Sequence, residues 1–278
     1  MKKSVLFVAM LLLILYSDLL CQVNLPLTGR SLEGMFSRIR ENLSSEQKLR
    51  INDSTQTLVD KYAKSDSVFT YKFDNLRFLG QIISPDSLVK IISWNLILES
   101  GDNSYYCYFI RKGKDNSSND VYKLSGLYSE KAIGSDTLYS DSNWYGALYY
   151  DIRPFKVAGT EQSYVILGID YGNSFVTRKV IDILTFGSDH KLIFGKKCFV
   201  DGKVLRQRVV FEYSTKVVMS LRFMNDKSIV FDHLSPSSPE FRDNHQFWGP
   251  DFSFDSYNLE NGFWRLKSDV DVRIERGK

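Results

Sequence analysis

The chain has 278 residues, of which 43% are apolar and 14% aromatic, and its formal net charge is +3. This composition supplies enough apolar side chains for a sizeable core and excludes an intrinsically disordered chain. The small net charge also excludes the strongly basic surface on which nucleic-acid binding depends.

Residues 1–21 have the pattern of an export signal. Two lysines precede an unbroken apolar run of twelve residues, Val5–Tyr16, which is too short for a membrane span of about 20 residues. Bacterial lipoprotein signals resemble a pattern with a small residue directly before the cysteine. Leu20 stands at that position here, so we do not expect a lipid anchor at Cys21. We predict cleavage before Gln22 and export, to the periplasm or cell surface, of a mature chain without a transmembrane segment.

Residues 22–65 have helical periodicity, unlike the rest of the chain. The stretch SLEGMFSRIRENL places apolar side chains at i, i+3, i+4 and i+7, which is one face of a helix. A second stripe follows in SSEQKLRINDSTQTLVDKYAKS, with Ser44 or Ser45 as the expected N-cap. The two stripes consist of Leu32, Met35, Phe36 and Ile39, and of Leu58, Val59 and Tyr62. We predict two helices, or one broken helix, packed on the domain that follows.

Residues 66–278 change to a period of two and predict an antiparallel all-β domain. Runs rich in β-branched and aromatic residues alternate with turn sequences such as SGDNS, YGNS and MNDK. Asp201-Gly202 is the strongest hairpin signal, and connections this short favour antiparallel neighbours. The predicted fold class is therefore mainly β, a meander of about a dozen strands with a short N-terminal helical segment. A curved sheet, a sandwich and a barrel-like sheet all fit, whereas a propeller is disfavoured because no regular repeat is present.

The alternation within two strands indicates which faces are buried. VLRQRVVFEY is expected to turn one face to the core and the other partly to solvent. The core face is Leu205, Gln207, Val209 and Phe211, and the other face is Val204, Arg206, Arg208 and Val210. In YYCYFI both faces are apolar, which favours a central strand or one covered by the N-terminal helices. The polar interval 112–142 is expected to include a mobile loop or an irregular hairpin.

Two cysteines, Cys107 and Cys198, remain after the signal, each in an apolar run typical of a strand. An oxidising envelope would permit a disulfide. We favour two buried thiols that pack as small apolar side chains, and the sequence leaves their pairing open.

Several stretches together are similar to a group of exported proteins common in Bacteroidota. They are FLGQIISPDSLVKIISWN, YVILGIDYGNSFVTRKVIDIL, FEYSTKVVMSLRF with SIVFDHLSP, and GPDFSFDSYNLENGFW, and the likeness spans residues 70–275. The group has no known activity. The resemblance therefore implies an exported all-β protein and assigns no catalytic residues.

The sequence contains no nucleophile elbow and no zinc-type spacing. His190 stands alone in a turn, and His233 and His245 lack an HExxH or Cys-His arrangement. We therefore expect these histidines to make ordinary hydrogen bonds, and we predict no catalytic residue, no metal and no cofactor.

A weak calcium pattern lies in DFSFDSYNLENG, where alternate oxygens stand at the first, third and fifth positions of a loop. Its candidate ligands are Asp251, Ser253 and Asp255. The pattern fails further on, since Ser256 replaces the required glycine and Gly262 replaces the glutamate. We favour a last hairpin that turns at Glu260-Asn261-Gly262, with Phe252 and Phe254 facing inward.

The surplus of aromatic side chains supplies candidate binding residues, because rings stack on sugars and anchor protein interfaces. The stretch DHLSPSSPEFRDNHQFWGPDFSFD predicts a long connection from a strand that ends at Phe231 to the last hairpin. Pro236 and Pro239 would stiffen this connection, which we expect to present part of itself on one rim of the sheet. The candidate binding residues are Trp248, His245, Trp144 and Tyr145.

Two functions fit these observations. The first is a non-enzymatic binding or assembly component of the cell envelope, with an envelope protein or a glycan as its partner. The second is a glycan-acting hydrolase that uses strand-borne carboxylates as acid and base. Its candidate carboxylates are Asp151, Asp170, Asp182 and Glu212. We favour the first because the sequence contains no catalytic motif.

Overall fold

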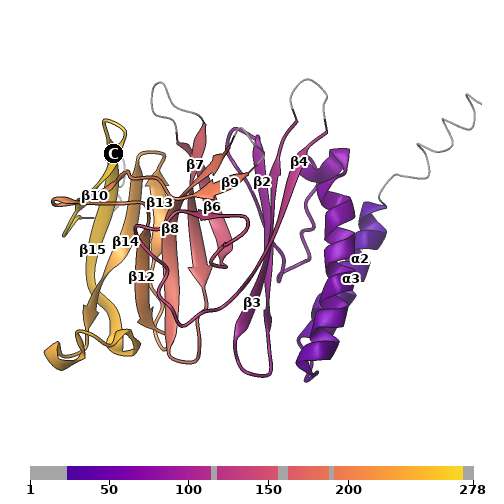
Figure 1. Ribbon diagram of the computed structural model, residues 1–278, viewed down its shortest axis with the longest axis horizontal. Helices are drawn as coiled ribbons and strands as arrows, with labels where there is room; N and C mark the ends of the chain where they lie inside the picture. The colour runs from indigo at the N-terminus through magenta and orange to yellow at the C-terminus, as the bar shows by residue number, and fades with distance from the viewer. Residues whose placement is uncertain (1–23, 114–117, 156–161, 188–190, 272–278) are drawn as a thin grey trace, which may run out of the picture. The chain divides into compact units, whose positions relative to one another are not determined.

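The computed structural model describes residues 24–113, 118–155, 162–187 and 191–271. The chain is mainly β, as predicted, and divides into two compact units, one ending at Arg77 and one beginning at Phe78 (Figure 1). Within the described ranges, no helix combines the length and the apolarity needed to cross a membrane. The predicted export signal, Cys21 and His190 lie outside the described residues.

The N-terminal unit contains the two predicted helices. They are α2 (Leu25–Ile39) and α3 (Ser45–Ala63), followed by the short 3-10 helix η1 (Asp66–Phe69). The Asn24 side chain accepts a hydrogen bond from the backbone of Leu27 and so caps α2. Ser44 and Gln47 form a reciprocal capping box at the start of α3. This confirms Ser44, one of the two predicted caps.

The second unit contains three β-sheets. Sheet A has the strand order β1 (Gly80–Ile83), β2 (Val89–Ile97), β3 (Asn103–Arg111), β4 (Asp120–Leu127). Sheet B has the order β5 (Tyr139–Ser140), β9 (Leu192–Phe194), β8 (Val176–Phe186), β7 (Ser163–Asp170), β6 (Leu148–Phe155), with β12 (Val209–Ser214) also paired to β8. Sheet C has the order β11 (Val204–Arg206), β10 (Phe199–Asp201), β16 (Phe263–Lys267), β15 (Trp248–Glu260), β14 (Ser228–Pro236), β13 (Leu221–Asn225).

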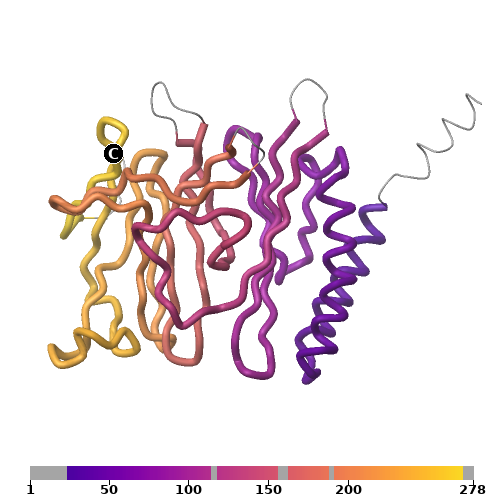
Figure 2. Tube along the Cα trace, viewed as in Figure 1, coloured from indigo at the N-terminus to yellow at the C-terminus, as the bar shows by residue number. Residues whose placement is uncertain are grey.

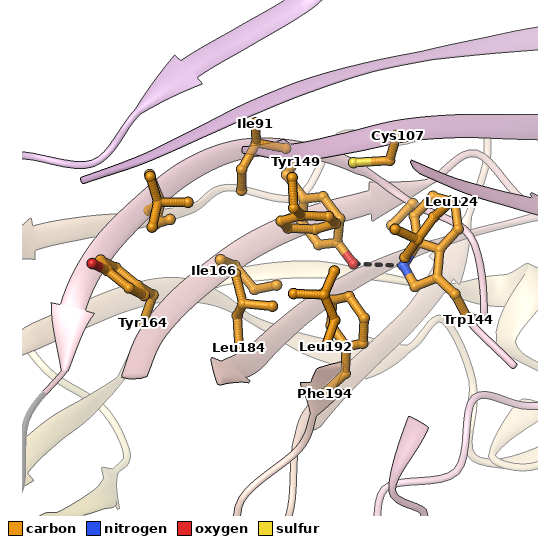
Figure 3. Packing of buried hydrophobic residues seen from close by; sticks show 14 of the residues in the cluster. Ile91, Cys107, Leu124, Trp144, Tyr149, Tyr164, Ile166, Leu184, Leu192 and Phe194 are labelled. Carbon is orange, nitrogen blue, oxygen red and sulfur yellow. Dashed lines mark hydrogen bonds between the residues drawn. The ribbon is translucent and has the colours of Figure 1, made fainter. Parts of the chain in front are cut away.

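Sheet B lies between the other two sheets, so the unit has three layers and two cores (Figure 1). The A–B core joins side chains of sheets A and B, among them Ile91, Phe109, Tyr149 and Ile166, and is seen in close-up in Figure 3. The B–C core joins side chains of sheets B and C, among them Leu167, Ile183, Phe231 and Trp264. Strand β8 supplies buried side chains to both cores, which explains why VTRKVIDILTF has apolar residues on both faces.

The cysteines are free and lie on opposite sides of sheet B, Cys107 in the A–B core and Cys198 in the B–C core. This confirms two buried thiols. Burial raises the pKa of Cys107 well above its usual value and that of Cys198 to about 12. We expect neither thiol to react with a thiol-specific reagent at neutral pH in the folded protein, and both to react after denaturation, because the thiolate is the reactive form. A mass-spectrometric labelling assay would contradict this by finding either cysteine modified without unfolding.

Short connections give antiparallel neighbours almost throughout, as predicted, and the strands are divided among three sheets. Strand β10 pairs with β16 in parallel, through Phe199 with Trp264 and Val200 with Arg265. The stretch KLIFGKKCFV splits into β9 of sheet B and β10 of sheet C, and VLRQRVVFEY splits into β11 and β12. The chain therefore changes sheets inside runs that local alternation reads as continuous strands. The predicted hairpin at Asp201-Gly202 is confirmed, with Asp201 paired to Val204.

The predicted faces of VLRQRVVFEY are partly wrong. Val209 is buried in the B–C core as expected, but Leu205 is 40% exposed. Arg208, expected on the partly solvated face, is completely buried. The reason is that β12 lies beside β8 on an inner sheet, where Arg208 meets Asp182.

Candidate functional site

The stretch from Asp232 to Asp255 is shorter as a connection than predicted. Strand β14 does not end at Phe231 but runs on to Pro236, which pairs with Trp248 at the start of β15. Only residues 237–247 connect the two strands, through the 3-10 helices η2 (Pro239–Phe241) and η3 (His245–Phe247). A proline is tolerated here because it stands at the end of its strand.

The predicted residues Trp248 and His245 lie together at this end of the sheets. Their rings are 5.2 Å apart, and the Trp248 indole donates a hydrogen bond of 3.1 Å to the Phe241 carbonyl. The rings of Phe241 and Phe247 stack at 4.1 Å. Nδ1 of His245 lies 3.2 Å from Oε2 of Glu212 on β12. The connection is thus fixed to the inner sheet rather than free.

Glu212 belongs to a row of charges that crosses sheet B in register. Arg178 on β8 stands opposite Asp170 on β7 and Glu212 on β12. Its guanidinium lies 3.3 Å from Oδ2 of Asp170 and 2.5 Å from Oε1 of Glu212. Asp170 also accepts a hydrogen bond of 2.7 Å from the Tyr105 hydroxyl. Burial raises the pKa of Asp170, and its hydrogen bonds and Arg178 oppose this rise.

A second buried ion pair lies on the same face, between Arg208 and Asp182 at 2.8 Å. The Arg208 guanidinium also donates to the carbonyls of Gly134, Thr137 and Phe194. It stacks against the ring of Tyr139 at 4.6 Å. Every direction around this guanidinium is thus occupied by a carboxylate, a carbonyl or a ring, as a buried charge requires.

The candidate residues Trp144 and Tyr145 take part in the hydrogen bonding around this ion pair. Tyr145 donates a hydrogen bond to Asp182, and Tyr149 donates one to Tyr145. The Trp144 indole donates to the Tyr149 hydroxyl (Figure 3). Trp144 is only 6% exposed. The structure therefore places these two residues in the A–B core, apart from the pair formed by Trp248 and His245.

Both arginines hold the segment between β4 and β5, which we call the strap (residues 128–138). Arg178 donates to the carbonyls of Ser129 and Glu130, and Arg208 to those of Gly134 and Thr137. Figure 2 shows this segment crossing from sheet A to the strands of sheet B. Much of the polar interval 112–142 is thus strand β4 and a fixed strap, while residues 114–117 lie outside the described ranges.

Three neighbouring loops at this end expose apolar side chains, and we call these side chains the rim. They are Tyr171 and Phe175 of the β7–β8 loop, Val217 and Val218 of the β12–β13 loop, and Phe247 of η3. Val218 is 85% and Phe175 60% exposed. The backbone of Thr215 donates to the Phe175 carbonyl, which joins the first two loops, and Gly249, two residues after Phe247, lies beside Val217.

The loops that carry the rim are held by side-chain hydrogen bonds. Oδ1 of Asn173 accepts from the backbone of Phe175 at 2.8 Å and of Val176 at 3.0 Å. Gly172 has a positive φ, and a Cβ there would lie 1.9 Å from the Val176 carbonyl, so only glycine fits this turn. The neighbouring Met219 is buried in the B–C core, and its carbonyl accepts from Lys179 at 2.6 Å.

Sequence reasoning missed Phe175, Val217 and Val218. KVVMSLRF is rich in β-branched residues, which favour a strand, but β13 begins only at Leu221. Phe175 directly precedes β8, so the local pattern does not separate it from that strand. The YGNS turn signal was the one local indication that this aromatic side chain stands at a loop.

The last hairpin is confirmed, since β15 and β16 turn at Asn261 and Gly262, both with positive φ. The inward position of Phe252 is wrong, because this residue is 95% exposed, also with positive φ. It lies where β15 bulges opposite His233. Three residues there face one of β14, and the alternation is interrupted.

The weak calcium candidates are engaged with protein groups. Oδ1 of Asp251 accepts from the backbone and the hydroxyl of Ser253, and Asp255 accepts from the backbone of Asp269. Oδ2 of Asp255 lies 2.7 Å from Nδ1 of His233. No group of three or more potential metal-binding side chains is found among the described residues.

The hydrogen bond to Asp255 raises the pKa of His233, with a smaller contribution from the Asp251 charge. A raised pKa means that protonated His233 stabilises the fold and that this contribution is lost as pH rises through the raised pKa. His233→Gln should therefore lower the free energy of unfolding near pH 5 by about 0.2–1 kcal/mol, since the ring is nearly half exposed. Chemical denaturation should find a smaller difference at pH 8, and an equal loss at both pH values would contradict the assignment.

The four candidate carboxylates do not form one acid–base pair. Asp170 and Glu212 share Arg178, and Asp182 is sealed with Arg208. Asp151 lies 2.5 Å from Arg153 on β6. Each of the four carboxylates is thus paired with an arginine, and two of them share one.

The chain was compared with protein families, curated proteins and solved structures. None of them matches it. The rim and the ion pairs of sheet B are therefore the features that bear on function.

Proposed function

We propose that this protein is an exported, non-enzymatic binding or assembly component of the cell envelope, located in the periplasm or at the cell surface, which binds its partner through the rim. The observation that carries the proposal is that three locked loops together expose Phe175, Val218 and Phe247. Exposing such side chains in one place costs solvation free energy, and contiguous apolar patches on a folded protein are typical of interaction sites. Trp248 and His245 would support the rim from behind.

The locked loops favour binding because little conformational entropy is lost when they meet a partner. Thr215 bonds the β7–β8 loop at Ser174 and Phe175. His245 links the third loop to Glu212 of sheet B. A preorganised surface of this kind gains affinity by reducing the cost of ordering side chains at the interface.

The alternative, a glycan-acting hydrolase, has weaker support. Glycoside hydrolysis needs two carboxyl groups that face the same bond, one able to donate a proton and the other ionised. Asp170 and Glu212 are instead bridged by Arg178, whose guanidinium holds one oxygen of each carboxylate. Asp182 is completely buried. These contacts support a structural role for the carboxylates.

Chemical crosslinking of the tagged mature chain in its native envelope tests the proposal. We expect one dominant envelope species, with crosslinks concentrated in residues 237–247, and a several-fold lower yield for Trp248→Ala at unchanged expression. The matched control is Phe263→Ala, an exposed aromatic residue on β16. Release of sugar from envelope glycan by the wild-type protein, abolished by Glu212→Gln, would contradict the proposal and favour the hydrolase.

A further inference from the structure

Strand β4 is the outer strand of sheet A and pairs on one side only, with β3. The backbone N–H of Tyr128 donates to the Asn103 carbonyl, so this pair and every second pair along the ladder bond β4 to β3. The backbone groups of the residues in between point outward, and within the described ranges no backbone hydrogen bond to them is found. We call these residues the β4 edge: Val121, Lys123, Ser125 and Leu127.

The other edge strands of the described sheets are blunted, and β4 is not. Strand β5 has two residues, β11 three and β1 four. Strand β6 contains Pro154 and a register shift, and η3 lies beside β12 through His245 and Glu212. Strand β13 also has a register shift, and its Leu221 carbonyl accepts a hydrogen bond from the Tyr150 hydroxyl. Short strands, prolines, bulges and covering segments are the means by which sheets avoid pairing with other chains.

Strand β4 has none of these protections. It has eight residues, contains no proline, and pairs with β3 without a register shift. Lys123, Ser125 and Leu127 of its edge are exposed. A regular edge of this length is a template on which another strand can add.

We infer that the β4 edge pairs with the β4 edge of a second copy of this chain. The two strands are antiparallel and related by a two-fold axis at Leu124. Val121 then lies opposite the partner's Leu127, and Lys123 lies opposite the partner's Ser125. All four edge residues of each copy exchange backbone hydrogen bonds, and sheet A continues across the axis into the second copy.

The side chains of the β4 edge match in this register. They stand on one face of the sheet, because they are alternate residues of one strand. Leu127 is 59% exposed in the single chain, and a cross-strand contact with the partner's Val121 buries apolar surface on both. Lys123 faces a neutral serine, so no two like charges stand directly opposite.

Other registers fit less well. A shift of two residues in one direction places Lys123 against the partner's Lys123, and in the other direction against the partner's Leu127. Both shifts also leave edge residues unpaired. A shift of one residue turns half of the hydrogen-bonding groups away from each other. The register with full overlap is therefore also the register in which the side chains agree.

This agreement favours a second copy over a different extended chain. An unrelated strand would meet the same backbone groups, but the β4 edge carries a single charge and no pocket-filling aromatic residue to select its side chains. A two-fold interface requires a patch that complements itself, and the β4 edge does so along its whole length. None of the rim side chains belongs to the β4 edge, so a dimer here is a property separate from binding at the rim.

Analytical ultracentrifugation of the mature chain, from about 1 μM to about 200 μM, tests the dimer because its formation follows mass action. Ser125→Pro removes an outward N–H and leaves every bond to β3 in place. Ser125→Ala, the matched control, keeps that N–H. We expect wild type and Ser125→Ala to dimerise alike, and the dissociation constant of Ser125→Pro to be at least about tenfold larger. Thermal melts check that each variant remains folded.

A pair of charge variants tests the register and does not depend on the proline. Ser125→Lys places a lysine opposite the partner's Lys123, whereas Ser125→Glu places a carboxylate there, and the two-fold axis repeats each contact. Ser125→Lys should dimerise at least about fivefold more weakly than Ser125→Glu at low salt, with a smaller difference at about 1 M salt.

Hydrogen exchange gives a third readout. The amides of Lys123, Ser125 and Leu127 should exchange more slowly as the concentration of the wild-type chain rises. A wild-type chain that stays monomeric at the highest concentration would overturn the inference. So would a dimer that Ser125→Pro leaves unchanged, equal dissociation constants for Ser125→Lys and Ser125→Glu, or exchange at these amides that does not depend on concentration.

Discussion

Arg208→Met should lower the free energy of unfolding by about 3–5 kcal/mol, the usual cost of removing one partner from a buried ion pair. Asp182 would then stay in a site with no exposed surface and no countercharge. The carbonyls of Gly134, Thr137 and Phe194 would also lose their donor. Chemical denaturation at neutral pH measures the loss.

The same variant should recover part of its stability at acid pH. Burial raises the pKa of Asp182 even beside Arg208, and without the guanidinium it should rise further. A carboxyl whose pKa is raised by folding destabilises the fold above that pKa, so the deficit should shrink as pH falls. Arg206→Met, at a pair that is more than one third exposed, should change stability by less than about 1 kcal/mol. Equal losses for the two variants would contradict the sealed ion pair.

Arg178→Met should lower the free energy of unfolding by about 3 kcal/mol or more and loosen the rim as well. The substitution leaves Asp170 buried without its guanidinium and releases one oxygen of Glu212, whose other oxygen lies beside His245. Arg178 also holds the strap at Ser129 and Glu130. Native-state hydrogen exchange should therefore be faster in the strap and in the loop 237–247.

Arg153→Met is the matched control for this prediction. Arg153 pairs with Asp151 and with Asp226 and lies over the ring of Phe223, and its side chain is 28% exposed. We expect a change of less than about 1 kcal/mol and unaltered exchange in the loop 237–247. If Arg178→Met destabilises the protein without altering exchange in that loop, the proposed link between the core and the rim is wrong.

The elements that sequence predicted correctly depend on short-range signals. Ser44 and Gln47 are three residues apart and mark a helix start, and Asn261-Gly262 marks a two-residue turn. The sheet to which each strand belongs depends on pairs far apart along the chain. Arg208 is 26 residues from Asp182 and more than 70 from the carbonyls of the strap. Local alternation therefore could not distinguish a buried arginine from a solvated one.

The candidate site could be predicted only in part, because it too depends on contacts between residues far apart along the chain. Trp248 and His245 stood out because an aromatic residue and a histidine lie in a stretch rich in proline. The rim itself required three loops to meet, which only the assembled sheets determine. Trp144 and Tyr145 were named because they are aromatic, yet a neighbouring tyrosine and Asp182 hold them in the A–B core. Composition shows that aromatic side chains able to anchor a partner are present. The topology of the sheets decides which of them face solvent.

The central claim is that the rim is a binding surface. A photo-crosslinking amino acid incorporated into the protein in living cells tests it most directly. It would be introduced singly at Phe175, Val218 and Phe247 of the rim, and at Val204 and Leu205 of the β10–β11 hairpin. We predict that illumination yields the same protein adduct from all three rim positions and none from the two hairpin positions. An adduct from the hairpin alone, or no rim adduct at normal expression, would contradict a binding surface at the rim.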